Sequence, residues 1–407
     1  MTDLMQLGQQ AKDSAQQLAL MPTNRKNELL VQMAKTIKKN QQAIIEANHK
    51  DLEKAVENNI SETMQDRLQL TPERINAMVA EIEKIASLDD PIGKVDEMWT
   101  NTDGLRIGKK RVPLGVIGII YESRPNVTTD AASLAFKSGN AVILRGGKEA
   151  FFSNQLLVQL LQQVLLSAGE SPYAIQFVDD TSHETAEQLM RLTEYLDVLI
   201  PRGKEQATVP IIETGTGNNH VYIDKEAQLS MAVKIIVNAK ASRPSVCNAA
   251  ETLLIHSEIA PFFLPAIEKE LVEHGVSLRA DARALEYLET AALAEEADWD
   301  TEYLDYILAV KVVDSLSEAI AHINRHNTKH SETIVTDSYS ASQRFLNEVD
   351  AAAVYVNAST RFTDGSVFGF GAEIGISTQK LHARGPMGLN ELTSTKYIIY
   401  GDGQIRE

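Results

Sequence analysis

The only cysteine of the 407-residue chain, Cys247, lies in a polar, proline-containing segment at residues 242–249 (SRPSVCNA). A cysteine that serves only packing usually lies in an apolar segment. Residues 227–241 have the apolar spacing of an amphipathic helix, which would hold Cys247 on a loop beside a rigid element. Arg243 and nearby backbone N–H groups favour the thiolate, the nucleophilic form of cysteine. The segment therefore predicts a reactive thiol, and a half-buried structural thiol is the alternative.

Two further segments carry residues typical of an enzyme site. Residues 210–220 (PIIETGTGNNH) place Glu213 and a glycine-rich bend after an apolar strand. Residues 113–145 contain two apolar segments that suit buried strands. In order and spacing, these segments and Cys247 resemble the aldehyde dehydrogenase superfamily. The separation of Glu213 from Cys247 matches that between the superfamily's glutamate and its catalytic cysteine.

Three longer strings give a narrower resemblance. They begin at Tyr121 (YESRPNVTTDAASLAFKSGNAVILRGGKEA), Ser242 (SRPSVCNAAETLLIH) and His382 (HARGPMGLNELTSTKY). They are similar to those members of the superfamily that reduce L-glutamyl 5-phosphate to L-glutamate 5-semialdehyde in proline biosynthesis, and the similarity extends from about Leu7 to Tyr400. The resemblance implies an NADPH-dependent oxidoreductase that works through a cysteine thioester and releases phosphate.

Two other functions remain open at this point. The first is a hydrolytic, NAD(P)-dependent semialdehyde dehydrogenase, and the second is a dinucleotide-binding scaffold without catalytic activity. A scaffold of this kind would dock glutamate 5-kinase, which makes the acyl phosphate, and this kinase is a candidate partner of the enzyme as well. The pairing of Cys247 with Glu213 favours an enzyme.

Length, charge and cysteine content agree with a metabolic enzyme. A chain of 407 residues normally forms two or three domains. Its 39 basic and 56 acidic residues give a net charge of −17, which disfavours nucleic acid and anionic membranes as partners. One cysteine cannot form an internal disulfide, the N-terminus does not resemble a signal peptide, and no apolar run is long enough to span a membrane. We therefore expect a cytoplasmic protein.

The first ninety or so residues have helical apolar spacing, and Thr71, Pro72 and Glu73 form a helix-start signal. Residues 95–112 change to a β-like pattern with a hairpin turn at Asp103 and Gly104. In the aldehyde dehydrogenase family the equivalent ribbon pairs with the C-terminal strand in oligomerisation, which here would be residues 396–400. The resemblance thus implies a homo-oligomer, and an ordinary edge hairpin is the alternative.

Short apolar strands alternate with helices between residues 114 and 224, which is typical of a dinucleotide-binding parallel sheet. The strand candidates are residues 114–121, 141–144, 175–178, 198–201 and 220–224. We therefore predict an α/β, aldehyde dehydrogenase-like fold with a Rossmann-like cofactor domain, an α/β catalytic domain and a small β oligomerisation flap. The predicted domains are residues 1–94 with 113–224 for the cofactor, 225–390 for catalysis, and 95–112 with 391–407 for the flap.

The cofactor residues follow from the resemblance, because the glycine fingerprint is incomplete. Gly215 and Gly217 fit the first two positions of G-x-G-x-x-G, but His220 occupies the third. By resemblance, Arg145 takes the place of the lysine that contacts the adenosine ribose, and Lys148 is close enough to join it. A guanidinium there would favour an additional 2′-phosphate, so we expect NADP(H).

A second cofactor segment is the turn at residues 201–204. Pro201, Arg202 and Gly203 resemble the loop that opens the helix facing the pyrophosphate, where helix-start amides hold anions. With Arg145, Lys148 and Gly215, they complete the predicted cofactor-binding set.

The resemblance also assigns the catalytic groups. Cys247 would attack the γ-carbonyl, and the side chain of Asn126 and the Cys247 amide would stabilise the oxyanion. Asn126 has an alternative role as the cap of a helix at residues 127–137. We expect Glu213 to line the site without acting as an efficient deacylating base, and its alternative role is to orient the nearby loop.

An anionic substrate also needs guanidinium groups. The candidates lie in polar loops, and each has the alternative role of capping a turn: Arg124, Arg243, Arg361 and Arg384. Ser359 lies in the loop at residues 357–362, which resembles the position where related semialdehyde enzymes hold the amino-acid head group of the substrate.

No metal site is expected. His322, His326 and His330 recur every four residues, but the polar residues between the last two indicate that the helix has ended before His330. Residues 284–300 are acidic and rich in alanine, and we expect a solvated helix and loop there.

Overall fold

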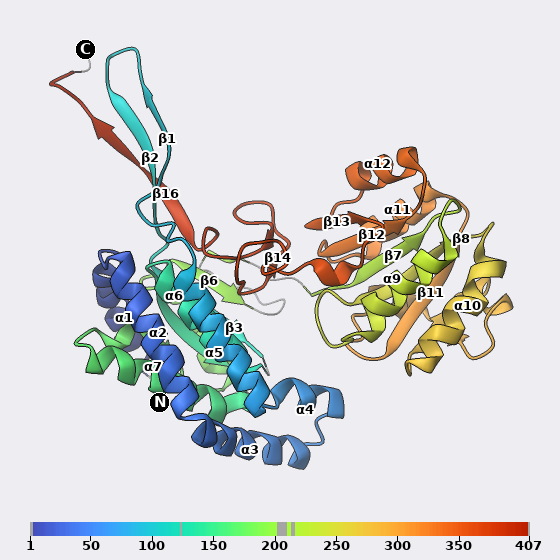
Figure 1. Cartoon of the computed structure of the whole chain (residues 1–407), viewed down its shortest axis with the longest axis horizontal. Helices are drawn as coiled ribbons and strands as arrows, with labels where there is room; N and C mark the ends of the chain where they lie inside the picture. Colours follow the sequence, from blue (N-terminus) through green and yellow to red (C-terminus); the bar gives the residue numbers. More distant parts are fainter. Residues whose placement is uncertain (1–2, 123, 202–209, 213–215, 406–407) are drawn as a thin grey trace. The chain divides into compact units, whose positions relative to one another are not determined.

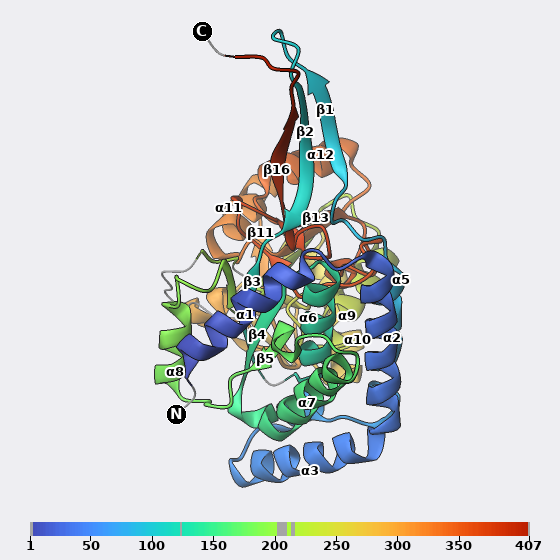
Figure 2. The ribbon, with the colours of Figure 1, turned by 90° about the vertical axis from the view of Figure 1, so that its left-hand side faces the viewer.

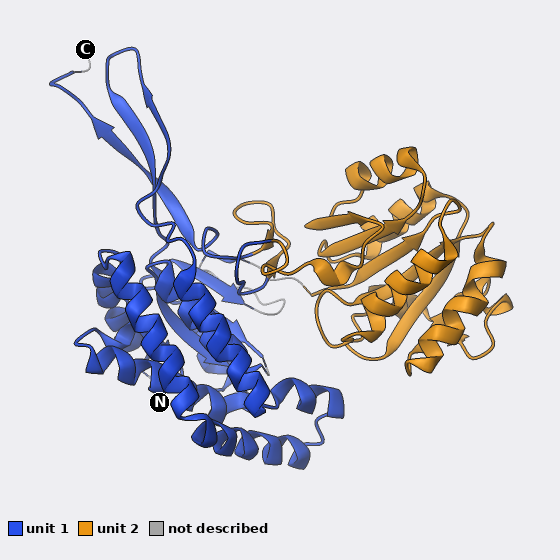
Figure 3. Cartoon of the chain, in the orientation of Figure 1, with its two compact units in different colours: residues 1–213, 369–375, 387–407 blue, residues 214–368, 376–386 orange. Residues whose placement is uncertain are grey.

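The structure, a computed structural model, describes residues 3–122, 124–201, 210–212 and 216–405. The chain forms two compact units (Figure 3). Unit 1 comprises residues 1–213, 369–375 and 387–407, and unit 2 comprises residues 214–368 and 376–386. None of the helices in the described ranges combines the length and apolar character that a membrane span requires.

The described part of unit 1 contains a four-stranded parallel sheet in the order β5-β4-β3-β6. The strands are β3 (Val116–Tyr121), β4 (Ala141–Gly146), β5 (Ile175–Phe177) and β6 (Val198–Pro201). All six residues of β3 are buried, as expected for a parallel strand covered on both faces. The predicted Rossmann-like sheet is therefore confirmed for four of its five strand candidates.

Helices cover this sheet and extend the core of unit 1 (Figures 1 and 2). They are α1 (Leu4–Leu18), α2 (Thr23–Lys39), α3 (Gln41–Glu57), α4 (Glu62–Leu68), α5 (Pro72–Ser87), α6 (Pro125–Lys137), α7 (Phe151–Ser167) and α8 (His183–Met190). The predicted helix start is confirmed, because the Thr71 hydroxyl accepts a hydrogen bond from the backbone N–H of Arg74 at 3.3 Å and Pro72 is the first residue of α5.

A three-stranded antiparallel ribbon projects from the α/β body of unit 1 (Figures 1 and 2). It consists of β1 (Val95–Thr100), β2 (Arg106–Pro113) and β16 (Thr393–Tyr400). Strand β16 pairs with β2 along its whole length, from Thr393 opposite Pro113 to Tyr400 opposite Arg106. The predicted pairing of the hairpin with the C-terminal strand is therefore confirmed within one chain.

Unit 2 contains a seven-stranded sheet in the order β10-β9-β11-β8-β7-β12-β13, and all its described pairs are parallel. The strands are β7 (Asn219–Ile223), β8 (Ala250–His256), β9 (Ser277–Ala280), β10 (Ala292–Leu293), β11 (Ile307–Val313), β12 (Ser331–Val335) and β13 (Ala353–Val356). Helices α9 (Leu229–Ala241) and α10 (Ala260–Glu273) pack on one face of the sheet, and α11 (Leu316–His326) and α12 (Tyr339–Glu348) pack on the other. A two-stranded pair, β14 (Ile376–Ser377) and β15 (Gly385–Pro386), completes the unit.

Two sequence predictions are wrong. The strand predicted at residues 220–224 for the first sheet is β7, which lies between β8 and β12 in unit 2. Its five residues are all buried, and this pattern suits the centre of either sheet. The helix predicted within residues 284–300 is instead two 3-10 turns, η3 (Ala284–Glu286) and η4 (Glu296–Asp300), on either side of β10.

Candidate active site

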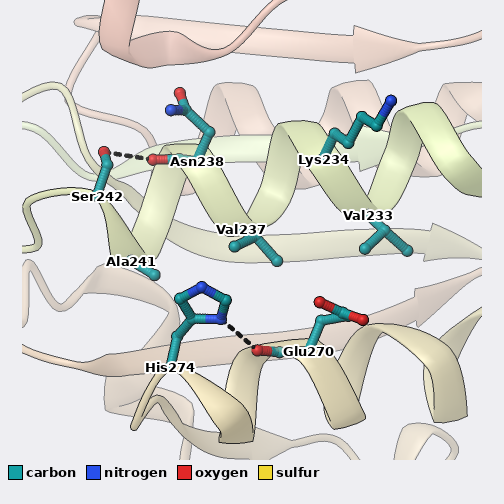
Figure 4. A pocket seen from close by; sticks show the side chains of 8 residues that line it. All are labelled: Val233, Lys234, Val237, Asn238, Ala241, Ser242, Glu270 and His274. Carbon is teal, nitrogen blue, oxygen red and sulfur yellow. Dashed lines mark hydrogen bonds between the residues drawn. The ribbon is translucent and has the colours of Figure 1, made fainter.

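Cys247 lies on the connection between α9 and β8, residues 242–249, which we call the nucleophile loop. The helix that precedes it was predicted and ends at Ala241. The Ser242 hydroxyl donates to the backbone carbonyl of Asn238 at 2.6 Å and closes the end of this helix (Figure 4). Cys247 forms no disulfide, and the residue is partly buried.

Asn219, the first residue of β7, holds the backbone of the nucleophile loop. Its side-chain Nδ2 donates to the carbonyl oxygens of Cys247 and Ala249, both at 2.7 Å. Its Oδ1 accepts from the backbone N–H of Ser331 at 3.1 Å, which fixes the orientation of the amide. The side chain is fully buried, so these carbonyl groups depend on it rather than on water for a donor.

The glycine-rich segment approaches the same backbone. A side chain at Gly217 would place its Cβ only 1.5 Å from the carbonyl oxygen of Cys247, so no other residue fits there. Gly217 donates its backbone N–H to Glu302 Oε1 at 2.7 Å, and Asn218 donates its own to the Thr328 hydroxyl at 3.0 Å. These contacts hold residues 216–218 against the nucleophile loop.

A second loop, residues 357–363, packs against the nucleophile loop at Asn248. Asn248 Nδ2 donates to the carbonyl oxygen of Thr363 at 3.0 Å, and the Thr360 hydroxyl donates to the carbonyl oxygen of Asn248 at 2.7 Å. Ser359 caps the short turn η5 (Thr360–Phe362) by accepting from the backbone N–H of Arg361 at 3.3 Å. Ser359 is therefore held by its capping role and lies close to the loop that carries the thiol.

The guanidinium of Arg361 joins the two loops. It donates to the side-chain oxygen of Asn248 and, through Nε, to the Ser242 hydroxyl at 3.2 Å. Burial lowers the pKa of Arg361, the charge of Arg243 lowers it further, and the charges of Cys247 and Asp364 oppose this. Two arginines predicted to bind substrate thus lie within electrostatic range of one another, and Arg361 lies within range of the thiol. Such a site favours anions.

Arg384 has a different environment. Its guanidinium pairs with Asp350 at 2.6 Å, and Lys380 and Lys329 approach the same carboxylate at 2.9 and 3.6 Å. The hydrogen bonds from Lys380 and then Arg384 hold the pKa of Asp350 at about 2. Arg384 would have to leave this carboxylate in order to bind substrate.

The predicted cofactor residues that the structure describes lie in unit 1, at the carboxyl edge of the parallel sheet. Arg145 in β4 and Pro201 in β6 flank the same residue of β3, Ile120. The Arg145 guanidinium donates to the backbone carbonyls of Thr181 and Ser182 at 2.8 and 3.0 Å, which fixes its plane. Dinucleotides bind at this edge of α/β sheets, and the positive charge of Arg145 suits a phosphate-bearing ribose, so these residues fit NADPH.

Three other predicted residues of unit 1, Lys148, Arg124 and Asn126, lie in a short turn or at the start of a helix. Lys148 is exposed in the turn η1 (Lys148–Ala150). Helix α6 begins at Pro125 with Arg124 as its N-cap residue, so the alternative of Asn126 as the cap is wrong. Asn126 lies in the first turn and donates to Asp130 at 3.0 Å.

Four of the predicted residues lie outside the described ranges: Arg202, Gly203, Glu213 and Gly215. Arg124, Asn126, Arg145, Lys148 and Pro201 belong to unit 1, whereas Cys247 belongs to unit 2. The structure therefore brings together the thiol, Ser359 and two arginines, and separately the residues of the sheet edge in unit 1.

Sequence reasoning missed the groups that hold Cys247, among them Asn219, Asn248 and Thr360. It also missed Lys240 and Glu251, which form a fully buried ion pair at 2.6 Å. A signal for the pair was present, since Lys240 falls on the apolar side of a helix and Glu251 lies within an apolar strand. Charged residues are seldom fully buried unless paired.

A group of histidines lies in unit 2 near the residues where β7 and β12 begin, which is the edge of the sheet at which the nucleophile loop leads into β8. His220 Nδ1 lies 3.1 Å from Glu332 Oε2, and His326 Nδ1 lies 2.8 Å from Asp300 Oδ1. Burial lowers the pKa of His220, His322 and His330 to about 3, 2 and 4. Helix α11 ends at His326, which confirms only the prediction that it ends before His330. In the parts of the chain that the structure describes, no three His, Cys, Asp or Glu side chains form a metal-binding group.

A surface groove of about 360 Å³ lies between α9 and α10 (Figure 4). Its apolar lining comes from Val233, Val237 and Ala241, and Glu270 and His274 line the α10 side. Ser242 lies at one end, so the groove borders the nucleophile loop without containing the thiol among its lining residues.

Comparison with known proteins agrees with this fold. The family model described as the aldehyde dehydrogenase family matches residues 2–300 and 295–398. The chain therefore belongs to the aldehyde dehydrogenase family, and its relatives narrow the assignment within that family.

A protein named gamma-glutamyl phosphate reductase from Enterococcus faecalis is 69% identical over 413 residues, covering 100% of this chain and 99% of that protein. One of the same name from Listeria monocytogenes is 58% identical over 100% of both chains. The crystal structure of gamma-glutamyl phosphate reductase from Thermotoga maritima has 46% identity and a TM-score of 0.93 over 100% of both chains.

Proposed function

We propose that this protein reduces L-glutamyl 5-phosphate to L-glutamate 5-semialdehyde with NADPH and releases phosphate, as a step of proline biosynthesis. Relatives that share 69% and 58% of its residues carry the name of this activity. The observation that carries the proposal is Cys247 on a loop held by Asn219 and Asn248, beside the guanidinium of Arg361.

The nucleophilic step requires a thiolate and a leaving group. The Cys247 thiolate attacks the γ-carbonyl carbon, a C–S bond forms, and the C–O bond to phosphate breaks with departure of phosphate as a stable anion. The Cys247 backbone N–H and the Asn126 side chain are the proposed donors to the oxyanion. The arginines beside the thiol hold the charges of the phosphate and the α-carboxylate.

Reduction of the thioester completes the reaction. NADPH supplies a hydride when bound, and the proposed residues for its binding are Arg145, Lys148 and Pro201 with the undescribed Arg202, Gly203 and Gly215. A hydride delivered to the thioester carbon would break the C–S bond, so the role of Cys247 is to leave as the thiolate while the aldehyde is released. Water must not reach the thioester first, so we propose that Glu213 lines the site without deacylating it.

Association with other chains is part of the proposal. One face of the ribbon exposes Trp99, Tyr397 and Ile399, at 42%, 64% and 60%. Because a narrow ribbon cannot cover this face by itself, we propose that it packs against a second copy of the chain. The lability of an acyl phosphate makes glutamate 5-kinase a proposed partner, and the free thiol suits the reducing environment of the cytoplasm.

The test of this function is the reverse reaction. NADP⁺ reduction with glutamate 5-semialdehyde should require phosphate, because phosphate must attack the thioester to release the acyl group. Turnover at the same rate in phosphate-free buffer would instead identify a hydrolytic dehydrogenase. Cys247→Ala should abolish turnover in both buffers.

A further inference from the structure

The ion pair of Lys240 and Glu251 spans the two ends of the nucleophile loop. Lys240 lies in the last turn of α9, and Glu251 is the second residue of β8. Their Nζ and Oε2 atoms are 2.6 Å apart, and neither side chain has any exposed surface. The residues that carry Cys247 therefore begin and end at a fixed separation.

Burial makes each member of the pair depend on the other. Burial raises the pKa of Glu251 to about 7 and lowers that of Lys240, and in each case the partner's charge acts in the opposite direction. Apolar side chains of similar volume usually stabilise an interior at least as well as a buried ion pair. Stabilisation of the fold is therefore a weak explanation for the presence of this ion pair. A directional contact that fixes the geometry of a loop explains it better.

The segment at residues 302–304 connects the ion pair to the backbone near Cys247. The backbone N–H of Leu304 donates to Glu251 Oε1 at 3.4 Å, and the ring centre of Tyr303 lies 5.9 Å from Lys240 Nζ. Leu304 has a φ of 54°, a left-handed conformation that a branched side chain rarely adopts. Such strain persists only where the surroundings enforce it.

The same segment reaches Gly217. Glu302, two residues before Leu304, accepts the backbone N–H of Gly217 at 2.7 Å, and Gly217 lies directly against the carbonyl oxygen of Cys247. One strained segment thus contacts both the ion pair and the glycine that limits where the Cys247 carbonyl can lie.

We propose that Lys240 and Glu251 are positioning residues for the nucleophile: the pair sets the separation of the loop ends and so holds the thiol and the backbone N–H of Cys247 in the geometry that attack requires. The inference rests on the proposed function, in which Cys247 is the nucleophile. Displacement of a reacting group by about 1 Å can cost on the order of 100-fold in rate.

The test is the charge-free double variant Lys240→Met/Glu251→Leu, which avoids leaving one charge buried alone. Its kcat in the reverse reaction should fall by roughly 10- to 100-fold, while KM for the semialdehyde and for NADP⁺ stays within about twofold because neither residue lines the proposed binding groups. The rate of alkylation of Cys247 by iodoacetamide, without substrate, should change several-fold, which a purely stabilising role would not produce.

The matched control is Lys26→Met/Asp90→Leu, which removes another buried ion pair, of 2.8 Å, from unit 1. It should leave kcat and the alkylation rate within about twofold of the wild type, whatever its effect on the melting temperature. Wild-type kcat in the Lys240/Glu251 double variant would overturn the inference, and so would an equal loss in both double variants.

A third variant covers a failure to fold. Glu251→Asp keeps both charges, so that neither is left buried alone, but it shortens the carboxylate side chain by one methylene and so changes the length of the contact. Its kcat should fall with KM unchanged, and an unchanged kcat would overturn the inference. The wild type separates the two claims: absence of phosphate-dependent turnover in the wild type contradicts the proposed function, whereas full activity in the variants contradicts only the positioning role.

Discussion

At the scale of single residues, contacts to the backbone of Cys247 hold the nucleophile in position. Asn219 uses both protons of one amide on the carbonyls of Cys247 and Ala249. Gly217 leaves just enough space for the first of these carbonyls. Substitutions at these two positions should therefore affect catalysis even though neither side chain carries a reactive group.

Asn219→Asp tests the first contact. A carboxylate has the same shape but cannot donate, so two carbonyl oxygens would face a negative charge in a buried site. Each lost hydrogen bond to a buried group costs about 1–3 kcal/mol, and we expect a lower melting temperature together with a fall in kcat of at least about tenfold.

The control for this substitution is Asn324→Asp, because Asn324 Nδ2 also donates to a backbone carbonyl, that of Glu348, at 2.8 Å but at an exposed site. It should keep wild-type kcat. Equal activity in the two variants would show that the contact of Asn219 is dispensable for catalysis.

Gly217→Ala tests the close approach of Gly217 to the carbonyl oxygen of Cys247. The added methyl group would meet the Cys247 carbonyl at 1.5 Å, so one of the two backbones must move. We expect a loss of kcat greater than tenfold and a change in the rate of thiol alkylation. Gly275→Ala is the comparison, since its Cβ would meet nothing within 4 Å; it should lower stability through its positive φ but keep kcat. Full activity of Gly217→Ala would refute the steric argument.

Residue types and spacing identified Cys247, and the resemblance added Arg243, Ser359 and Arg361 as candidates. The structure places Ser359 and Arg361 at the nucleophile loop, and their roles toward substrate stay predictions. Asn219, Asn248 and Thr360 could not be predicted, because their partners are backbone groups 28 to 115 residues away in the chain. Apolar patterns carry no information about such partners.

At the scale of elements, apolar patterns predicted all five strands between residues 114 and 224 but not the sheet to which the last of them belongs. The five buried residues of β7 are equally suited to the centre of either parallel sheet, so the pattern could not reveal that this strand pairs with β8 and β12. Residues 284–300 have a helix-forming composition. However, Trp299 and Asp298 are buried, with only 5% and 3% of their surface exposed. Tertiary packing of these two residues overrides local propensity.

The ribbon was predicted in two parts: the sequence pattern indicated the hairpin, and the resemblance to the aldehyde dehydrogenase family implied its pairing with the C-terminal strand. Trp99, Tyr397 and Ile399 share one face, and the rings of Trp99 and Tyr397 contact edge to face with centroids 6.3 Å apart. Tyr397→Lys/Ile399→Lys should place charges on this face and shift the protein to a smaller assembly, measured by light scattering after size-exclusion chromatography. Unit 1 should stay folded because both side chains are exposed.

The control for the ribbon is Ser394→Lys, an exposed position at the other end of β16, which should keep the wild-type mass. An unchanged mass for the Tyr397/Ile399 variant would mean that this face of the ribbon does not mediate association.

At the scale of the whole molecule, the buried histidines make stability depend on pH. Unfolding returns each imidazole to a pKa near 6.5, whereas the folded values are about 3, 2 and 4 for His220, His322 and His330. The unfolded chain therefore binds more protons, and the stability from these groups is present above pH 6.5 and lost as the pH falls toward 4. Glu332 and Glu251 act in the opposite direction, because burial raises their pKa values.

His322→Gln isolates one histidine. The variant should be less stable than the wild type at pH 7.5, because His322 packs against Trp299 with ring centroids 5.5 Å apart. This difference in unfolding free energy should shrink by about 1.4 kcal/mol per pH unit between about pH 6 and pH 4, measured by urea denaturation. His183→Gln is the control for loss of an imidazole at an exposed position. A pH-independent difference for His322→Gln would contradict the account.

The central claim is that Cys247 carries a thioester that phosphate, and not water, discharges. The most direct measurement is a rapid-mixing experiment with enzyme, NADP⁺ and glutamate 5-semialdehyde in phosphate-free buffer, followed by addition of phosphate. We expect a burst of about one NADPH per subunit, an acyl group on the peptide that contains Cys247 in the acid-quenched protein, and resumed turnover once phosphate is added. Continuous NADPH formation before phosphate is added, or an acyl group on any residue other than Cys247, would contradict this claim.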